Sequence, residues 1–138
     1  FSNLINSNGT VISVEELGAF FIARDIEIDM FEPLEKTDVP SASARNFART
    51  GGVGAAVKER LKDDSILKLD VINGLNKAGM AKLKMYGQIN VGKIQPNDTT
   101  GNLVEVMSCE GGCIAGPSVI TNPKVANILL NDYVKKSN

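Results

Sequence analysis

The chain has 138 residues, of which 43% are hydrophobic and 22% are charged. This length suits a single domain, and the apolar fraction is high enough to build a buried core. The formal net charge is −1, and the 15 Lys and Arg residues are scattered along the chain. The composition therefore argues against nucleic acid as a partner.

The sequence carries no sign of membrane insertion or export. No apolar run approaches the roughly 20 residues that a membrane-spanning helix needs, and the first residues lack the pattern of a signal peptide. The sequence therefore predicts a cytoplasmic protein with no membrane span. Because the chain opens on Phe1 rather than on an initiating Met, we expect it to be a piece of a longer protein.

The N-terminal half alternates expected regular elements with one long loop. A short strand is expected at 10–13, followed by a helix at about 14–25 that begins with a capping box of Ser13 and Glu16. Two prolines and several small residues make 29–49 a loop with one or two helical turns.

A second helix is expected to start at Gly51 and Gly52, where alanines and charged helix formers follow. We expect the amides of these two glycines to be free at the helix N-terminus. Free amides at that position form a binding site for anions.

The C-terminal half alternates strands with helices. The expected elements are a strand at 66–72, a helix at 75–86 that stops at Gly87, a strand at 102–108 and a helix that begins at Pro123 after an Asn122 cap. Such alternation predicts an α/β fold with a small, mainly parallel sheet of three or four strands flanked by helices. Ligands gather beyond the carboxyl ends of such strands, where the turns 73–74 and 109–113 are expected.

Cys109 and Cys113 are the only cysteines, and the chain has no histidine. The pair is compatible with half a zinc site, a disulfide, a redox dithiol, two buried core thiols, or two ligands of an iron–sulfur cluster. Structural zinc normally takes four Cys or His ligands, a disulfide across three residues is awkward, and redox dithiols use C-x-x-C. On spacing alone, buried thiols are the commonest of these alternatives.

The glycines of the same turn favour the cluster interpretation. Gly111, Gly112 and Gly116 let the backbone fold tightly around a group held by both sulfurs, and their amides can donate to cluster sulfides. Core thiols need no such turn. A cubane cluster normally takes four thiolates, so this chain would supply half of a site. We expect both sulfurs to face a common point.

The segment EVMSCEGGCIAG at 105–116 closely resembles the third cysteine motif of the iron-only hydrogenases. Three upstream segments resemble the same family in the same order: VISVEELGAFF at 11–21, ARTGGVGAAVKERL at 48–61, and LKLDVINGLNKAGMAKLK at 67–84. The resemblance covers the chain up to about Val119, and the cysteine motif is its specific part. It implies that 1–138 form a single α/β lobe of the two-lobed catalytic domain.

In that family the active site is the H-cluster, a 4Fe-4S cubane joined to a two-iron unit, at which protons are reduced or dihydrogen is oxidised. The resemblance implies that Cys109 is a cubane ligand and that Cys113 is shared by the cubane and the two-iron unit. It also implies that Met107 faces the two-iron unit, and that Gly51, Gly52, Gly111 and Gly112 help to bind the cofactor.

Other parts of the family pattern lie outside this chain or differ in it. The other two cubane ligands belong to upstream motifs, so the fragment alone is expected to hold no complete cluster and to be inactive. The implied partners are the N-terminal lobe of the same parent protein and a ferredoxin-like electron carrier.

The tail after Cys113 reads IAGPS in place of three glycines, Gln and Pro, and Glu110 replaces a common proline. These departures resemble sensory branches of the family. The sequence thus leaves three alternatives: part of a hydrogenase, part of a hydrogen or redox sensor, or an α/β domain with two buried structural cysteines.

Overall fold

The computed structural model describes residues 11–32, 34 and 40–136. By its internal contacts the chain divides into two compact units, Phe1–Lys36 with Ser118–Ile120, and Thr37–Pro117 with Thr121–Asn138. We describe each unit by itself. None of the helices in these described ranges is long and apolar enough to cross a membrane.

The first unit contains helix α1 (Val14–Ala23) and the short 3-10 helix η1 (Ile28–Met30). The expected capping box is confirmed, because the Ser13 hydroxyl accepts from the Glu16 amide at 3.1 Å and the Glu16 carboxylate accepts from the Ser13 amide at 2.7 Å. These bonds from Ser13 hold the pKa of Glu16 below its usual value. The expected strand is wrong over 11–13, where the backbone is irregular; Thr10 lies outside the described residues.

The second unit opens with a helical hairpin. Helix α2 (Ala42–Arg45) continues into the 3-10 helix η2 (Asn46–Ala48), and helix α3 (Gly52–Arg60) follows after a short turn. The expectation of a loop with one or two helical turns is confirmed for the described part of 29–49.

Two parallel strands, β1 (Leu69–Asn73) and β2 (Leu103–Met107), form the sheet, with Leu69 opposite Leu103 and Asn73 opposite Met107. The α/β class and the parallel direction are confirmed. The expected strand count is too high, since two strands pair within the described ranges rather than three or four. Strand β1 also starts three residues later than expected, because residues before Leu69 form a turn in which the Leu67 amide bonds the Asp64 carbonyl.

Helix α4 (Lys77–Asn90) links the two strands. The expected stop at Gly87 is wrong, because the helix continues through that residue. The left-handed residue that ends it is Gly92, with φ of 72°, and its amide bonds the Ile89 carbonyl at 3.0 Å. Asn76 caps the other end by accepting from the Gly79 amide at 3.0 Å.

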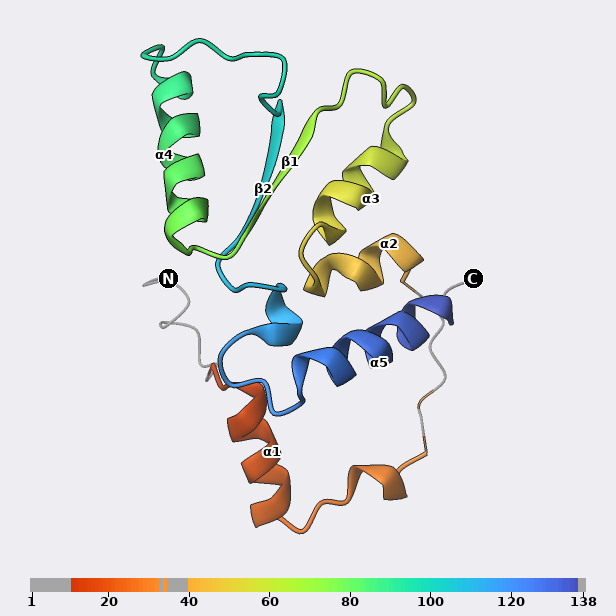
Figure 1. Ribbon diagram of the computed structural model, residues 1–138. Coiled ribbons are helices and arrows are strands. Elements are labelled where there is room, and N and C mark those ends of the chain that lie inside the picture. Colours follow the sequence, from red (N-terminus) through yellow and green to blue (C-terminus); the bar gives the residue numbers. More distant parts are fainter. Residues whose placement is uncertain (1–10, 33, 35–39, 137–138) are drawn as a thin grey trace. The chain divides into compact units, whose positions relative to one another are not determined.

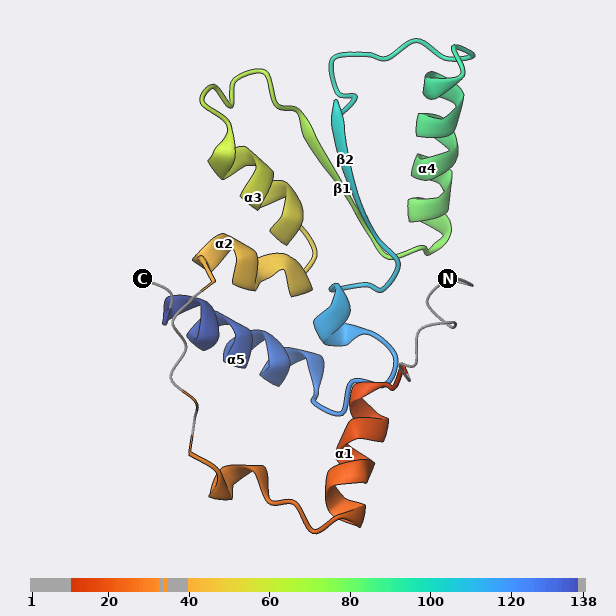
Figure 2. The same ribbon diagram turned by 180° about the vertical axis from the view of Figure 1, so that it is seen from behind.

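Helices α4 and α3 lie on opposite sides of the two-stranded sheet (Figures 1 and 2). Strand alternation explains this arrangement, because Ile72 points to α4, where its side chain meets Gly79, while Leu69 points to Gly54 of α3. Ile72 is 1% exposed and Ala56 of α3 is 8% exposed, and they are the buried hydrophobic side chains among the described residues. The core of this unit is therefore small.

A polar cluster joins β1 to α4 at the end of the sheet opposite the cysteines. The Asp70 carboxylate pairs with Lys82 and accepts from the Tyr86 hydroxyl at 2.6 Å, and that hydroxyl accepts from the Gly101 amide at 2.9 Å. Partial burial opposes ionisation of Asp70, but the bonds from Lys82 and Tyr86 outweigh it and keep its pKa below the usual value. Burial and the bond to Asp70 raise the pKa of Tyr86.

Helix α5 (Pro123–Lys135) begins after the expected Asn122 cap and packs against α2. The Arg45 guanidinium lies 4.0 Å from the centre of the Tyr133 ring and donates to the Tyr133 carbonyl at 2.6 Å. Arg49 donates to the Asn131 side-chain oxygen at 2.6 Å. Two arginines thus fix the helical hairpin to α5.

Candidate functional site

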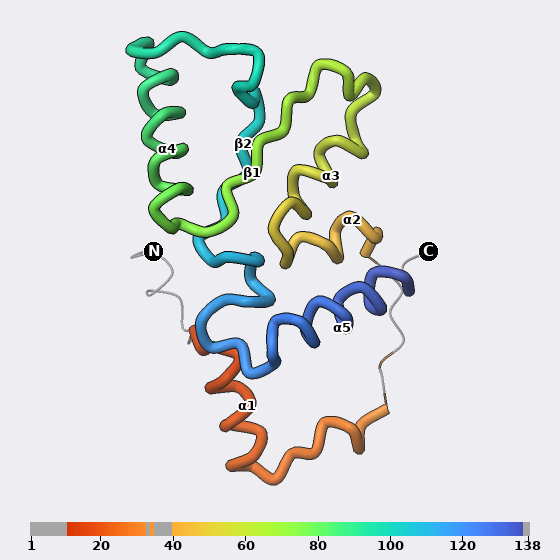
Figure 3. The backbone as a smooth tube through the Cα atoms, in the orientation of Figure 1, coloured from red at the N-terminus to blue at the C-terminus, as the bar shows by residue number. Residues whose placement is uncertain are grey.

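The cysteine turn, residues 108–116, follows β2 at the carboxyl end of the parallel pair and leads into the 3-10 helix η3 (Cys113–Ala115) (Figure 3). The turn after β1 lies beside it. The Gly74 amide donates to the Met107 carbonyl at 2.9 Å, and the Leu75 amide donates to the Ser108 carbonyl at 3.1 Å. The predicted meeting of these two turns at one edge of the sheet is confirmed.

Asn73 fastens the cysteine turn to a third segment, the loop before α3. Its side-chain oxygen accepts from the Gly111 amide at 2.7 Å and from the Thr50 hydroxyl at 2.8 Å. One exposed amide side chain therefore connects the end of β1, the cysteine turn and the start of α3. From the sequence alone, Asn73 is expected only to mark the end of a strand.

The backbone of this third segment runs directly against the turn. Arg49 and Gly112 form an isolated antiparallel bridge, and the Thr50 amide donates to the Gly111 carbonyl at 3.4 Å. Gly112 has φ of 87°, and a Cβ there would lie 2.7 Å from both the Ala48 carbonyl oxygen and the Thr50 amide nitrogen. Only glycine fits, so one role of Gly112 is to allow this close approach.

Both cysteines are free thiols; Cys113 is exposed and Cys109 is partly exposed. The alternative of two buried core thiols is therefore wrong, and no disulfide joins the pair. The Cys109 sulfur lies over Gly116, where a Cβ would approach it to 3.3 Å. The absence of a side chain at Gly116 leaves room beside the sulfur.

The glycine amides of the turn already have partners within the chain. The Gly111 amide donates to Asn73, the Gly112 amide donates to the Cys109 carbonyl at 3.1 Å, and the Gly116 amide donates to the Cys113 carbonyl at 3.3 Å. These glycines therefore shape the turn. In this conformation their N–H groups are not free to donate to an added group.

The expectation of free amides at Gly51 and Gly52 is wrong. The Gly51 amide donates to Glu105 Oε1 at 2.8 Å and the Gly54 amide donates to Glu105 Oε2 at 2.6 Å, while the Gly52 amide donates to the Arg49 carbonyl at 3.1 Å. Glu105 on β2 is 8% exposed. A carboxylate of the protein itself thus occupies the N-terminus of α3.

Glu105 is the important residue that sequence reasoning missed. The available signal was an acid in the middle of an otherwise apolar strand, at the position in register with Val71. A charged residue is seldom buried without a partner, so its place in β2 predicts that another element supplies donors to it.

Met107 ends β2, and its carbonyl accepts from Gly74. Met107 also lines a pocket of about 300 Å³ between β2 and α3, together with Val53 and Val57. The expected contact with a two-iron unit stays a prediction.

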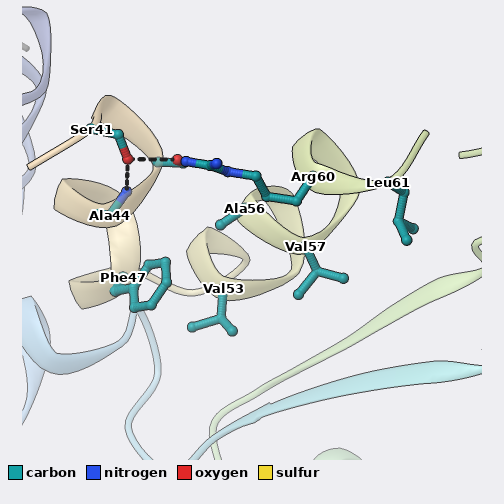
Figure 4. A pocket seen from close by; sticks show the side chains of 9 residues that line it. Ser41, Ala44, Phe47, Val53, Ala56, Val57, Arg60 and Leu61 are labelled. Atoms are coloured by element: carbon teal, nitrogen blue, oxygen red, sulfur yellow. Dashed lines mark hydrogen bonds between the residues drawn. The ribbon is translucent and has the colours of Figure 1, made fainter. Parts of the chain in front are cut away.

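An apolar pocket of the second unit lies elsewhere, between α2, η2 and α3. It encloses about 400 Å³, and Phe47, Val53 and Val57 form its apolar wall, while Arg60 lies at its rim (Figure 4). Arg60 is its one titratable lining residue, so this pocket lacks the groups that chemistry or metal binding would need.

The donor set of the cysteine turn fits an iron–sulfur cluster in part. Thiolates are the usual ligands of such clusters, and the turn presents two of them without another use. Within the described ranges, no group of three or more Cys, Asp or Glu side chains gathers that could hold a metal ion. The described chain therefore offers half of a four-ligand set.

Comparison with protein families decides the classification. The family described as "Iron only hydrogenase large subunit, C-terminal domain" matches residues 5–117. The chain belongs to this iron-only hydrogenase family. The match includes both strands and the whole cysteine turn, and it ends before helix α5.

Membership in the iron-only hydrogenase family implies an iron–sulfur H-cluster in the parent protein, and a C-terminal domain implies a partner region N-terminal to it. A search of curated proteins gives no match to the chain.

Proposed function

We propose that this chain forms one lobe of an iron-only hydrogenase domain and supplies two thiolate ligands, Cys109 and Cys113, to its H-cluster. The observation that carries the proposal is the cysteine turn itself. Two free thiols lie on a turn that two other segments, the end of β1 and the loop before α3, hold in shape. The turn lies at the edge of a parallel sheet where ligands usually bind.

The roles within the turn follow from the proposal. Cys109 is a ligand of the cubane, Cys113 is shared with the two-iron unit, and Met107 provides an apolar wall beside it. When bound, the cluster supplies the redox chemistry of proton reduction and dihydrogen oxidation. The protein's contribution at this position is to hold two sulfurs in a fixed orientation.

The rest of the site comes from a partner. Because four thiolates normally hold a cubane and the described chain offers two, the N-terminal lobe of the parent supplies the remaining ligands. The parent is an oxidoreductase acting on hydrogen in the cytoplasm, and it exchanges electrons with a ferredoxin-like carrier.

Anaerobic titration of the chain with Co²⁺ tests whether the two sulfurs act on one metal. The chain has two cysteines, so any sulfur-to-cobalt charge-transfer band comes from Cys109 and Cys113. We expect the band in the wild type, about half of its intensity in Cys109→Ser and in Cys113→Ser, and a Kd at least about tenfold weaker in each. Ser108→Ala is the matched control in the same turn and leaves both values unchanged.

Two outcomes of the titration contradict the proposal. In the first, Co²⁺ produces no charge-transfer band at all. In the second, each single cysteine variant binds Co²⁺ as tightly as the wild type. On the parent protein, full cluster content after iron and sulfide reconstitution of the double Cys→Ser variant contradicts it as well.

A second candidate function is sensing of hydrogen or redox state by the same cluster. The segment IAGPS after Cys113 favours it, because it replaces the glycine-rich tail of the turnover enzymes, and Ser118 adopts φ of 63°, where glycine is more usual. A hydrogen-uptake assay on the matured parent separates the two functions. Turnover at ordinary hydrogenase rates excludes a purely sensory role.

A further inference from the structure

Another pocket lies beside the cysteine turn, between the turn, the loop before α3 and the start of α5. It encloses about 390 Å³ and is lined by Arg49, Thr50, Gly111, Ile114, Ala115, Pro123, Lys124 and Asn127. Neither cysteine lines it. The pocket is therefore separate from the thiols, although Gly111, Ile114 and Ala115 belong to the segment that carries them.

The charged residues that line this pocket are all positive. Arg49 and Lys124 contribute two positive charges, and none of the lining residues is acidic. Glu110, the acid next to the lining in sequence, lies instead against Gly74, whose Cβ position is 3.2 Å from the Glu110 Cβ. Within the part of the chain that the structure describes, the three ion pairs involve neither Arg49 nor Lys124.

Arg49 also has a buried donor without an acceptor. One of its terminal nitrogens donates to Asn131, but its Nε is buried and has no hydrogen-bond partner. Buried donors in proteins nearly always have a partner, and an unpaired one indicates a missing water, ion or ligand. Arg49 itself lines the pocket, and a guanidinium suits a planar or tetrahedral oxyanion.

The remaining wall of the pocket is apolar. Ile114, Ala115 and Pro123 line it beside the two cations, and its volume exceeds what a bare inorganic anion fills. We propose that this pocket binds a small organic phosphate, with the phosphate group on Arg49 and Lys124 and an apolar body against these three side chains. The site uses no iron and no cysteine, so it stands independently of the H-cluster.

Binding of phenyl phosphate to the chain tests the proposal. The measurement uses the Cys109→Ser, Cys113→Ser variant, so that no metal contributes, and combines calorimetry with the amide NMR signals of Gly111, Ala115 and Lys124. We expect a Kd of about 1 mM or tighter, weaker binding in high salt, and shifts at these amides. Inorganic phosphate and benzyl alcohol each supply half of the ligand and are expected to bind at least about fivefold more weakly.

Charge variants assign the binding to the pocket. Lys124→Gln is expected to weaken phenyl phosphate binding about fivefold, and Arg49→Gln with Lys124→Gln at least about tenfold. Lys77→Gln is the matched control, because Lys77 is an exposed lysine in the first turn of α4 and lies outside the pocket; it leaves the Kd unchanged. Since Arg49 also holds Asn131, unfolding curves of the double variant accompany the measurement.

Three results overturn the proposal. The first is that phenyl phosphate does not bind the chain. The second is that Lys124→Gln and Lys77→Gln weaken the binding of phenyl phosphate equally. The third is that inorganic phosphate binds as tightly as phenyl phosphate. If the double variant unfolds, Lys124→Gln and the salt dependence still decide the outcome. Failure here leaves the role of the cysteines untouched, and loss of cobalt binding leaves this pocket untouched.

Discussion

Replacing Glu105 tests whether its buried carboxylate stabilises the N-terminus of helix α3. Its two oxygens accept from the Gly51 and Gly54 amides at 2.8 and 2.6 Å. A hydrogen bond to a charged group contributes about 1.5–3 kcal/mol, so Glu105→Ala loses about 3–4 kcal/mol of unfolding free energy once water partly hydrates the amides. Glu105→Gln keeps one acceptor oxygen and loses about 2 kcal/mol.

Urea unfolding followed by circular dichroism measures both values. Glu59→Gln serves as the control, because Glu59 is an exposed acid on α3, the helix whose N-terminus Glu105 binds, and its effect stays within about 0.5 kcal/mol. Hydrogen exchange of the Gly51 and Gly54 amides supplies a local readout, and both amides exchange faster in Glu105→Gln. Equal unfolding free energies for Glu105→Gln and Glu59→Gln, or unchanged exchange at the two glycines, would refute the reasoning.

Three further predictions concern single side chains. Asp70→Asn lowers the unfolding free energy at pH 7 by about 1–2 kcal/mol, because the bonds from Lys82 and Tyr86 favour the ionised carboxylate. Since the pKa of Asp70 is lowered in the folded state, the wild type keeps this advantage above the usual aspartate pKa and loses it as the pH falls through the lowered one. The urea curves of the two proteins therefore converge only at acidic pH, below the usual aspartate pKa. Gly112→Ala lowers the unfolding free energy by about 2–4 kcal/mol in the same assay, because φ at Gly112 is positive and the added Cβ meets backbone atoms. Gly87→Ala raises it by about 0.5–1 kcal/mol, because Gly87 lies in helix α4 with open space around its Cβ position. Equal effects of the two substitutions would contradict this prediction. Asn73→Ala frees the cysteine turn and speeds thiol labelling of Cys109 severalfold, and an unchanged labelling rate would count against its tethering role.

Local patterns predicted the helices and the parallel strands well, because their signals lie within a few residues. The Ser13 and Glu16 capping box and the Asn122 cap are where the sequence placed them. Helix α4 shows the limit of such signals. Gly87 and Gly92 look alike in the sequence, but only Gly92 has a left-handed backbone, and the helix tolerates Gly87 because propensity alone is a weak force.

The candidate site was predictable in its location and not in its contacts. The position of Cys109 and Cys113 after a strand placed them at the carboxyl edge of the sheet, and the parallel direction followed from the alternation of strands and helices. The partner of the α3 amides was missed because Glu105 is 54 residues from Gly51, and no local pattern reports a pair so distant. The amides expected to bind an anion from outside are bound by the protein itself.

The bond from Gly111 to Asn73 and the bridge from Gly112 to Arg49 join the cysteine turn to residues 38 positions or more away in the chain. A synthetic peptide that reproduces only the cysteine motif therefore lacks the two contacts that hold the cysteine turn in its conformation. A minimal mimic of this motif should include both strands and the preceding helix, because the residues that position the two thiols lie far outside the motif in the sequence.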